Sequence, residues 1–219
     1  MLFDIEIRKR LPSFDLEVCI RSDVQKLALV GASGSGKSLT LQLVSGLLQS
    51  DGGHIRIGSR TWFDSKSRTD IPAQKRGVGL MFQDYALFPH LTVAQNIGFG
   101  LRQGLLNPKG RPSEKVRHWL DLLRLSHVAG HYPHQISGGQ KQRTALARAL
   151  IVQPELLLLD EPFSALDADL RRHTRGELLQ LQAQSGVPMI LITHDRADAE
   201  VLADEIWRMD NGRVVKEPA

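Results

Sequence analysis

Gly31-Ala-Ser-Gly-Ser-Gly-Lys37-Ser38 follows an apolar run, Leu27-Ala-Leu-Val30, and opens a stretch with helical periodicity. This order of strand, glycine-rich loop and helix is the context that a phosphate-binding loop requires. The glycines let the backbone curl around phosphate oxygens, and N–H groups at the helix start point at the anion. The alternative, a glycine-rich turn that only links a strand to a helix, does not account for all four fixed positions of the motif.

Each residue type of this loop has a role in binding a nucleoside triphosphate. Lys37 adds a positive charge, and the Ser38 hydroxyl is placed to bind Mg²⁺. The residues that we expect to contact the nucleotide here are Gly31, Ala32, Ser33, Gly34, Ser35, Gly36, Lys37, Ser38 and Leu39.

Length and composition are those of an ordinary globular protein. The 219 residues, 42% hydrophobic and 24% charged, suffice for one sizeable core. No run approaches the roughly 18 consecutive apolar residues of a membrane span, and the first residues lack the pattern of a signal peptide. Cys19 is the only cysteine, which excludes an internal disulfide and leads us to expect a buried structural thiol. We therefore expect a cytoplasmic protein.

The charge pattern does not favour nucleic acid as a partner. The formal net charge is only +4, and basic residues are scattered among acidic ones. The short basic runs are expected to be solvated faces; they are Arg8-Lys9-Arg10, Lys109-Gly-Arg111 and Arg171-Arg172.

Strands and helices alternate along much of the chain, which predicts an α/β fold with a parallel core sheet. The segment up to about Ile20 alternates apolar and polar residues, as antiparallel strands do. From about 84 to 150 the pattern turns helical, interrupted at Asn107-Pro-Lys-Gly110. The expected core strands are 27–30, 77–82, 156–159 and 188–192, and the first helix is expected from Lys37 to about Leu48.

Two adjacent carboxylates follow the apolar strand Leu156–Leu159 directly. Open parallel sheets bind ligands at this carboxyl edge. Asp160 is suited to Mg²⁺ coordination, and Glu161 to a general base or water-positioning group at the γ-phosphate. A pair of strand-end carboxylates that caps a turn is the structural alternative.

A second glycine-rich helix start lies at Ile136-Ser-Gly-Gly-Gln140. Ser137 is expected to cap the helix, and the glycines leave backbone N–H groups accessible to an anion. One nucleotide needs only one such cradle. The residues alone leave open whether both cradles enclose one nucleotide or the second serves a neighbouring molecule.

Together these motifs resemble, over nearly the whole chain, those of the ATP-binding subunits of ABC transporters. In that family's terms Gly31–Ser38 looks like the Walker A loop, and Leu156–Asp160 looks like the Walker B strand. Gln83 looks like the Q-loop glutamine, and His194 looks like the switch histidine. Ile136–Gln140 is similar to the signature motif, and Ser164-Ala-Leu-Asp167 is similar to the D-loop. The signature departs once, with Ile136 where leucine is usual.

The resemblance implies a P-loop NTPase of the ABC ATPase type, formed by one domain over residues 1–219, with an N-terminal antiparallel part and a helical part at about 84–150. The sequence departs from many members of the family at its end, where we expect no C-terminal regulatory domain. It implies ATP and Mg²⁺ as cofactors, catalytic roles for Gln83, Glu161 and His194, and metal ligation by Ser38, Gln83 and Asp160. It also implies a head-to-tail homodimer, in which Ser137, Gly138, Gly139, Gln140 and Asp167 complete the site of the partner.

Phe14 is the best candidate for an aromatic residue that stacks on adenine, although it also suits an ordinary core position. The family further implies membrane permease subunits that dock near Gln83–Leu91, an extracytoplasmic solute-binding protein, and a place on the inner face of the membrane. Among its branches, the compact N-terminal hairpin and the segment Gln83–Leu91 look most like ATPases of molybdate or tungstate importers.

Two other functions remain open on the sequence. An exporter with separate subunits carries the same motifs. A non-transport ABC ATPase that acts on nucleic acid or ribosomes fits less well, because this chain has neither a long coiled-coil insert nor a second cassette.

Overall fold

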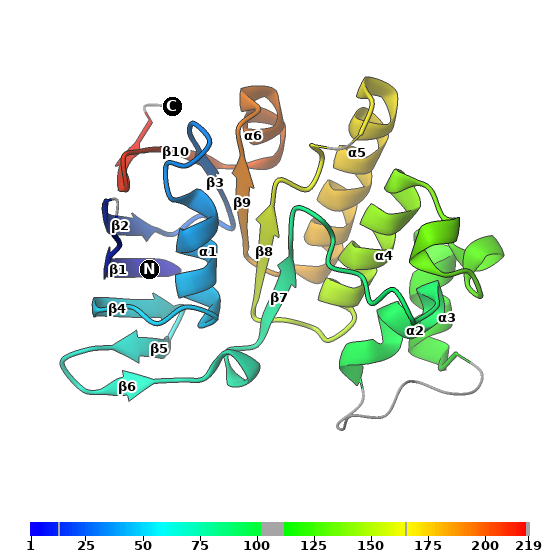
Figure 1. Ribbon diagram of the computed structural model, residues 1–219, viewed down its shortest axis with the longest axis horizontal. Coiled ribbons are helices and arrows are strands. Elements are labelled where there is room, and N and C mark those ends of the chain that lie inside the picture. Colours follow the sequence, from blue (N-terminus) through cyan, green and yellow to red (C-terminus); the bar gives the residue numbers. More distant parts are fainter. Residues whose placement is uncertain (13, 102–111, 165, 218–219) are drawn as a thin grey trace.

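The computed structural model describes residues 1–12, 14–101, 112–164 and 166–217. These residues form one 11-stranded sheet with the strand order β6-β5-β4-β1-β2-β11-β10-β3-β9-β8-β7, flanked by helices (Figure 1). Within this described part of the chain, every helix is too short or too polar to cross a membrane.

The core of the sheet is parallel, as predicted. It comprises β3 (Lys26–Val30), β9 (Met189–Thr193), β8 (Leu156–Asp160) and β7 (Val78–Met81), with β10 (Glu205–Asp210) pairing parallel to β3. The strands β8 and β9 are buried along their whole length. Successive leucines of β8 enter different hydrophobic clusters, Leu156 and Leu158 on one face, Leu157 and Leu159 on the other. Burial on both faces explains the unbroken apolar runs.

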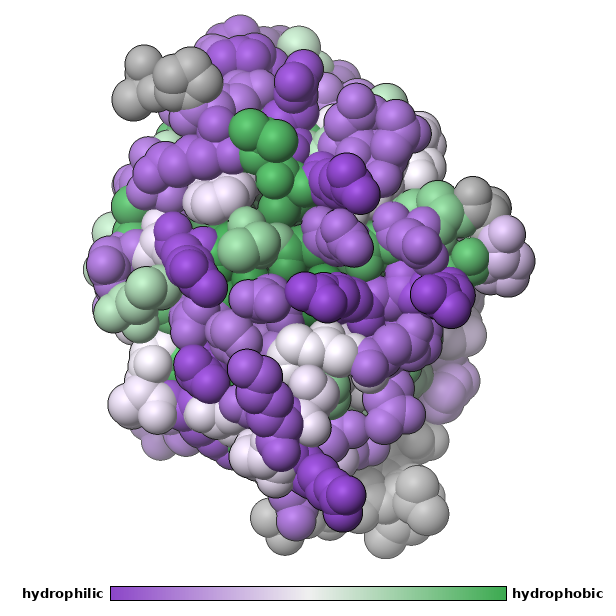
Figure 2. All heavy atoms as spheres, turned by 90° about the vertical axis from the view of Figure 1, so that its left-hand side faces the viewer, coloured by the Kyte–Doolittle hydropathy of each residue, from purple (hydrophilic) through white to green (hydrophobic). Residues whose placement is uncertain are grey.

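The N-terminal part is antiparallel. It contains β1 (Phe3–Arg10), β2 (Asp15–Ser22), β4 (Gly52–Ile57), β5 (Arg60–Asp64) and β6 (Thr69–Asp70), and β11 (Arg213–Lys216) joins β2 to β10. The left-hand side of the molecule, where these strands lie, is mainly hydrophilic (Figure 2).

The expected burial of Cys19 is wrong. Along β2 the side chains of Leu16, Val18 and Ile20 are buried, whereas Cys19 is exposed on the opposite face. Side chains of a strand alternate between its faces, so a residue out of phase with three buried ones cannot join them. The strand pattern here outweighs the general preference of cysteine for the interior.

The helix α1 (Lys37–Ser45) packs between the two parts of the sheet, with Leu41, Leu43 and Val44 in the cluster shared by both (Figure 1). It ends before the expected Leu48 because Gly46 takes a left-handed conformation, with a φ of 80°. The buried Arg76 donates hydrogen bonds to the carbonyls of Leu43 at 3.0 Å and Val44 at 2.8 Å. The Arg76 guanidinium therefore supplies hydrogen-bond donors to carbonyl groups at the C-terminal end of the helix that follows the phosphate loop.

Helices dominate the region that was predicted to be helical. They are α2 (Val93–Gly98), α3 (Glu114–Leu122) and α4 (Gly138–Leu150), with short 3₁₀ turns at Phe99–Leu101, Ser126–Val128 and Pro133–Gln135. Their shared core includes Ile97, Leu120 and Leu146. The expected interruption at Asn107–Gly110 and the basic run at 109–111 lie outside the described residues. Further on, α5 (Ala168–Ser185) precedes β9, and α6 (Arg196–Leu202) follows it.

Candidate nucleotide-binding site

Four core strands end at one edge of the sheet, and predicted site residues follow each of them. Gly31 follows β3, and Gln83 lies two residues after β7. Asp160 is the last residue of β8, Glu161 follows it, and His194 follows β9. The register places Val30 opposite Thr193 and Asp160 opposite Ile192, so these ends are level. The arrangement matches the ligand-binding edge of open parallel sheets.

The Lys37 side chain is hydrogen-bonded to the backbone at the start of the glycine-rich loop. This side chain is buried, and Nζ donates hydrogen bonds to the carbonyl oxygens of Gly31 at 2.8 Å and Ala32 at 2.7 Å. Burial lowers the pKa of Lys37, while the carboxylates of Glu161 and Asp160 raise it. Because a buried ammonium is stabilised by negative charge, this position suits a phosphate.

The loop needs glycine at its first position. A Cβ on Gly31 would lie 2.2 Å from the carbonyl oxygen of Met209, closer than a side chain tolerates. Gly36 has a φ of 110°, which L side chains rarely adopt. By contrast, a Cβ on Gly34 would meet open space, so the loop is open on that side.

Ser38 and Asp160 offer a pair of oxygen ligands. The Ser38 hydroxyl donates a hydrogen bond of 3.1 Å to Asp160 Oδ1. Burial raises the pKa of Asp160, an effect that the Ser38 hydrogen bond opposes. Hydroxyl and carboxylate oxygens are ligands that Mg²⁺ prefers, and a cation would stabilise the buried carboxylate. The residues present therefore fit the metal.

Glu161 and His194 form the most distinctive contact of the site. His194 Nδ1 lies 2.5 Å from Glu161 Oε2. Glu161 has a left-handed backbone with a φ of 48°, and its N–H donates to the carbonyl of Ile192 at 2.9 Å. Strained backbone of this kind persists only where the surroundings impose it, and it gathers at functional sites.

A pocket of about 190 Å³ opens between these groups. It is lined by Ser33, Gly34, Gly36, Lys37, Ser38, Leu39, Gln83 and Glu161. One chain thus brings together most of the predicted phosphate loop, Gln83 and the carboxylate of Glu161.

The predicted signature segment does not line this pocket. Ser137 caps α4 in a reciprocal arrangement, in which its hydroxyl accepts from Gln140 N–H at 3.3 Å and Gln140 Oε1 accepts from Ser137 N–H at 2.9 Å. The helix α4 lies on the far side of β7 and β8 from α1 (Figure 1). Ser137 and Gly138 are exposed, and a Cβ on Gly138 would meet open space. The expected helix cap at Ser137 is confirmed, whereas the binding of an anion by this segment stays a prediction, with Gly138 exposed and Gly139 buried.

Two further predicted residues, Asp167 and Phe14, do not line the pocket. Asp167 is exposed immediately before α5, and Ala165 of the predicted D-loop lies outside the described residues. Phe14 is half-buried, and its ring lies 3.5 Å from where a Cβ on Gly36 would stand and 3.0 Å from one on Gly212. The ring is therefore packed beside the phosphate loop, where its stacking on adenine stays a prediction.

Sequence reasoning missed a hairpin that supports the loop. Between β10 and β11 the chain turns at Asn211-Gly212, and Gly212 N–H donates to the Ser35 carbonyl at 3.0 Å. The carbonyl of Gly212 in turn accepts from Glu17 N–H at 2.7 Å. The Asn-Gly pair is a strong hairpin signal, but it carries no information about the partner of the turn.

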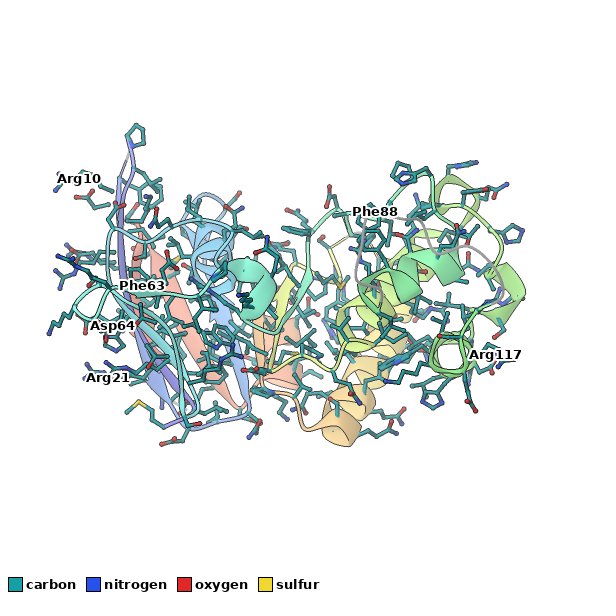
Figure 3. The ribbon with its side chains drawn as sticks, turned by 90° about the horizontal axis from the view of Figure 1, so that it is seen from below. Arg10, Arg21, Phe63, Asp64, Phe88 and Arg117 are labelled. Atoms are coloured by element: carbon teal, nitrogen blue, oxygen red, sulfur yellow. The ribbon has the colours of Figure 1, made fainter. Side chains whose placement is uncertain are left out.

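The segment Gln83–Leu91 is held against the helical part rather than free. Tyr85 and Leu91 are buried, and Arg148 donates to the carbonyls of Tyr85 at 2.8 Å and Ala86 at 2.7 Å. Phe88 lies beside the helical part (Figure 3). The centroid of its ring lies 4.3 Å from that of Phe99, an exposed residue.

Comparisons with known proteins identify a matching family model and related sequences. The family model described as ABC transporter matches residues 15–164, more than half of the chain. The sulfate/thiosulfate import ATP-binding protein CysA of Nephroselmis olivacea is 48% identical over 86% of this chain and 53% of its own length. The molybdate/tungstate import ATP-binding protein WtpC of Archaeoglobus fulgidus is 40% identical over 99% of this chain and 86% of its own. The chain therefore spans about half the length of some curated relatives that it matches.

A solved structure supports the fold. It is a dimeric ATP-binding cassette in a post-hydrolysis state bound to ADP and Pi, with a TM-score of 0.78 and 26% identity, and the match covers 98% of this chain and 97% of that one. The fold class predicted from sequence is thus confirmed.

Proposed function

This chain belongs to the ABC transporter family of ATP-binding proteins, and we propose that it hydrolyses ATP with Mg²⁺ to power uptake of an oxyanion through separate membrane subunits. The observation that carries the proposal is the convergence on one pocket of Lys37, Ser38 and Glu161, with Asp160 bonded to Ser38 and His194 to Glu161. The transfer of the γ-phosphoryl group of ATP to water supplies the free energy of transport.

Each side chain has a distinct role in this proposal. Lys37 and the loop amides bind the β- and γ-phosphates, and Ser38, Asp160 and Gln83 hold Mg²⁺. Glu161 accepts the proton of the attacking water, a role worth about 10² to 10⁴ in rate. His194, through its contact with Glu161 Oε2, orients that carboxylate.

The active species in this proposal is a head-to-tail dimer. The support is the outward-facing helix start at Ser137–Gln140, which offers backbone N–H groups to an anion but lies outside the pocket of its own chain. The dimeric state of the related cassette bound to ADP and Pi agrees with it. Ser137, Gly138, Gly139, Gln140 and Asp167 would then complete the partner's site, as the family resemblance implies.

The transported solute is proposed as an oxyanion rather than molybdate in particular. Relatives named for sulfate/thiosulfate import reach 48% identity, against 40% for the molybdate/tungstate relative. All these names describe ATP-binding subunits of importers, so we place the chain at the inner face of the membrane, with a permease and an extracytoplasmic binding protein as partners.

Reconstituted transport tests the function. The chain is purified with the permease encoded beside it and reconstituted in vesicles that enclose ATP and Mg²⁺, with the binding protein and labelled sulfate or molybdate added outside. We expect ATP-dependent uptake of at least one oxyanion, and no uptake with Lys37→Ala, which loses the charge that contacts the phosphates. ATP hydrolysis without uptake of any tested oxyanion would reject the solute class. Absence of hydrolysis would reject the ATPase itself.

The permease is proposed to dock beside Gln83–Leu91, on the apolar surface formed by Phe88, Phe99 and Val152. Its support is that Phe99 and Val152 are exposed large apolar residues near a segment that reaches the nucleotide pocket at Gln83.

We expect Phe99→Asp to lower recovery of the permease in affinity purification at least tenfold, because a carboxylate would be desolvated in the contact. Val201→Asp, at an exposed apolar residue on α6, is the matched control. Equal recovery with both variants would place the docking surface elsewhere.

A further inference from the structure

The imidazole of His194 has little packing to hold it. Its side chain is 59% exposed, and the contact with Glu161 Oε2 is the one hydrogen bond of the ring within the part of the chain that the structure describes. Where the ring lies therefore depends on the backbone on either side of it, at Thr193 and Asp195.

Asp195 is fixed at three atoms. Its N–H donates to Thr193 Oγ1 at 3.0 Å, its Oδ1 accepts from Ala197 N–H at 2.9 Å to cap α6, and its Oδ2 lies 2.5 Å from Arg171 Nη1. The third contact is the one that comes from another element, α5. Without the contact to Arg171, the Asp195 carboxylate would keep only its hydrogen bond to Ala197 N–H at the start of α6.

A second ion pair fixes the residue before His194. Arg175, also on α5, pairs with the buried Asp198 of α6. Asp198 Oδ2 accepts a hydrogen bond of 3.4 Å from the hydroxyl of the buried Thr193. The two pairs thus attach Thr193 and Asp195, the residues on either side of His194 in the sequence, to one face of α5.

Arg171 departs from the sequence expectation. It was expected with Arg172 to form a solvated face, and Arg172 does so with 80% of its side chain exposed. Arg171 is only 24% exposed, because one residue along a helix turns the side chain by about 100° toward α6. The neighbouring arginines therefore have different partners.

We propose that Arg171 and Arg175 are positioning residues that set the place of His194 against Glu161. Because α5 starts directly after Asp167, and Arg171 N–H donates to the Asp167 carbonyl at 2.9 Å, Arg171 also links His194 to Asp167. The proposal rests on the proposed function, since the consequence of a misplaced His194 is slower hydrolysis.

Kinetics of Arg171→Gln test the proposal against Arg172→Gln as the matched control. Both changes remove one arginine from neighbouring positions of the same helix, but only Arg171→Gln removes the ion pair with Asp195. We expect Arg171→Gln to lower kcat about tenfold with KM for ATP within twofold, since displaced catalytic groups cost rate rather than ground-state binding. Arg172→Gln should keep kcat within twofold. Arg171→Lys, which restores one donor, should recover most of the loss.

A readout without hydrolysis keeps the proposal separate from the proposed function. The ring resonances of His194, assigned by their loss in His194→Ala, should shift in Arg171→Gln and stay unchanged in Arg172→Gln. Unshifted His194 resonances in Arg171→Gln, or a kcat equal to that of Arg172→Gln, would overturn the proposal. If wild type hydrolyses no ATP while the resonances shift as expected, the proposed function fails and the positioning of His194 stands.

Discussion

Glu161→Gln is expected to reduce ATP hydrolysis by at least a hundredfold while ATP still binds. The amide keeps the shape of the side chain but cannot accept a proton from the attacking water, and general bases are typically worth about 10² to 10⁴ in rate. Nucleotide affinity should change little, because Lys37 and the glycine-rich loop are untouched. The contact with His194 is retained in form, since an amide oxygen also accepts a hydrogen bond.

The measurement is steady-state phosphate release together with calorimetric ATP affinity. Glu200→Gln is the control, because this exposed glutamate on α6 loses the same charge away from the pocket. Turnover of Glu161→Gln within about tenfold of wild type would refute the assignment of Glu161 as the base.

Ser137→Arg is expected to abolish hydrolysis without loss of ATP binding by the single chain. Ser137 lies outside the pocket of its own chain, so the monomer should bind nucleotide normally. In the proposed dimer the long side chain would stand where the partner's γ-phosphate approaches the start of α4. We expect hydrolysis to fall to the background of the assay.

Loss of a helix cap needs its own control. Replacing a capping serine costs about 1 kcal/mol of stability, whatever its function. Ser113 caps α3 in the same helical part by accepting from Val116 N–H, so Ser113→Arg carries the same change at another helix start. If Ser113→Arg abolished hydrolysis as fully as Ser137→Arg, the effect would be one of stability rather than of the composite site.

The edge of the sheet explains why so much of the site could be predicted from sequence. The residues Gln83, Asp160 and His194 each follow an apolar strand, and parallel strands end at a common edge, so their convergence needs only the strand order. The glycine-rich loop is local, and its conformation is carried by glycine itself.

What the sequence did not predict depends on contacts between distant residues. The Arg171–Asp195 pair joins positions 24 apart, and nothing in Arg171-Arg172 distinguishes the two arginines until α6 is placed. The hydrogen bond from Gly212 N–H to the Ser35 carbonyl likewise joins residues that are far apart in the sequence. Cys19 differs, because the alternation of β2 already placed it on the exposed face and residue type was given too much weight.

The central claim is that the start of α4 in one chain completes the nucleotide site of the other. Its most direct test is the molecular mass in solution, by light scattering after gel filtration in ATP and Mg²⁺, of Glu161→Gln alone and combined with Ser137→Arg. Slow hydrolysis in Glu161→Gln should trap the closed state, so we expect a dimer for the single variant and a monomer for the double variant. A double variant that forms an equally stable dimer would contradict the claim.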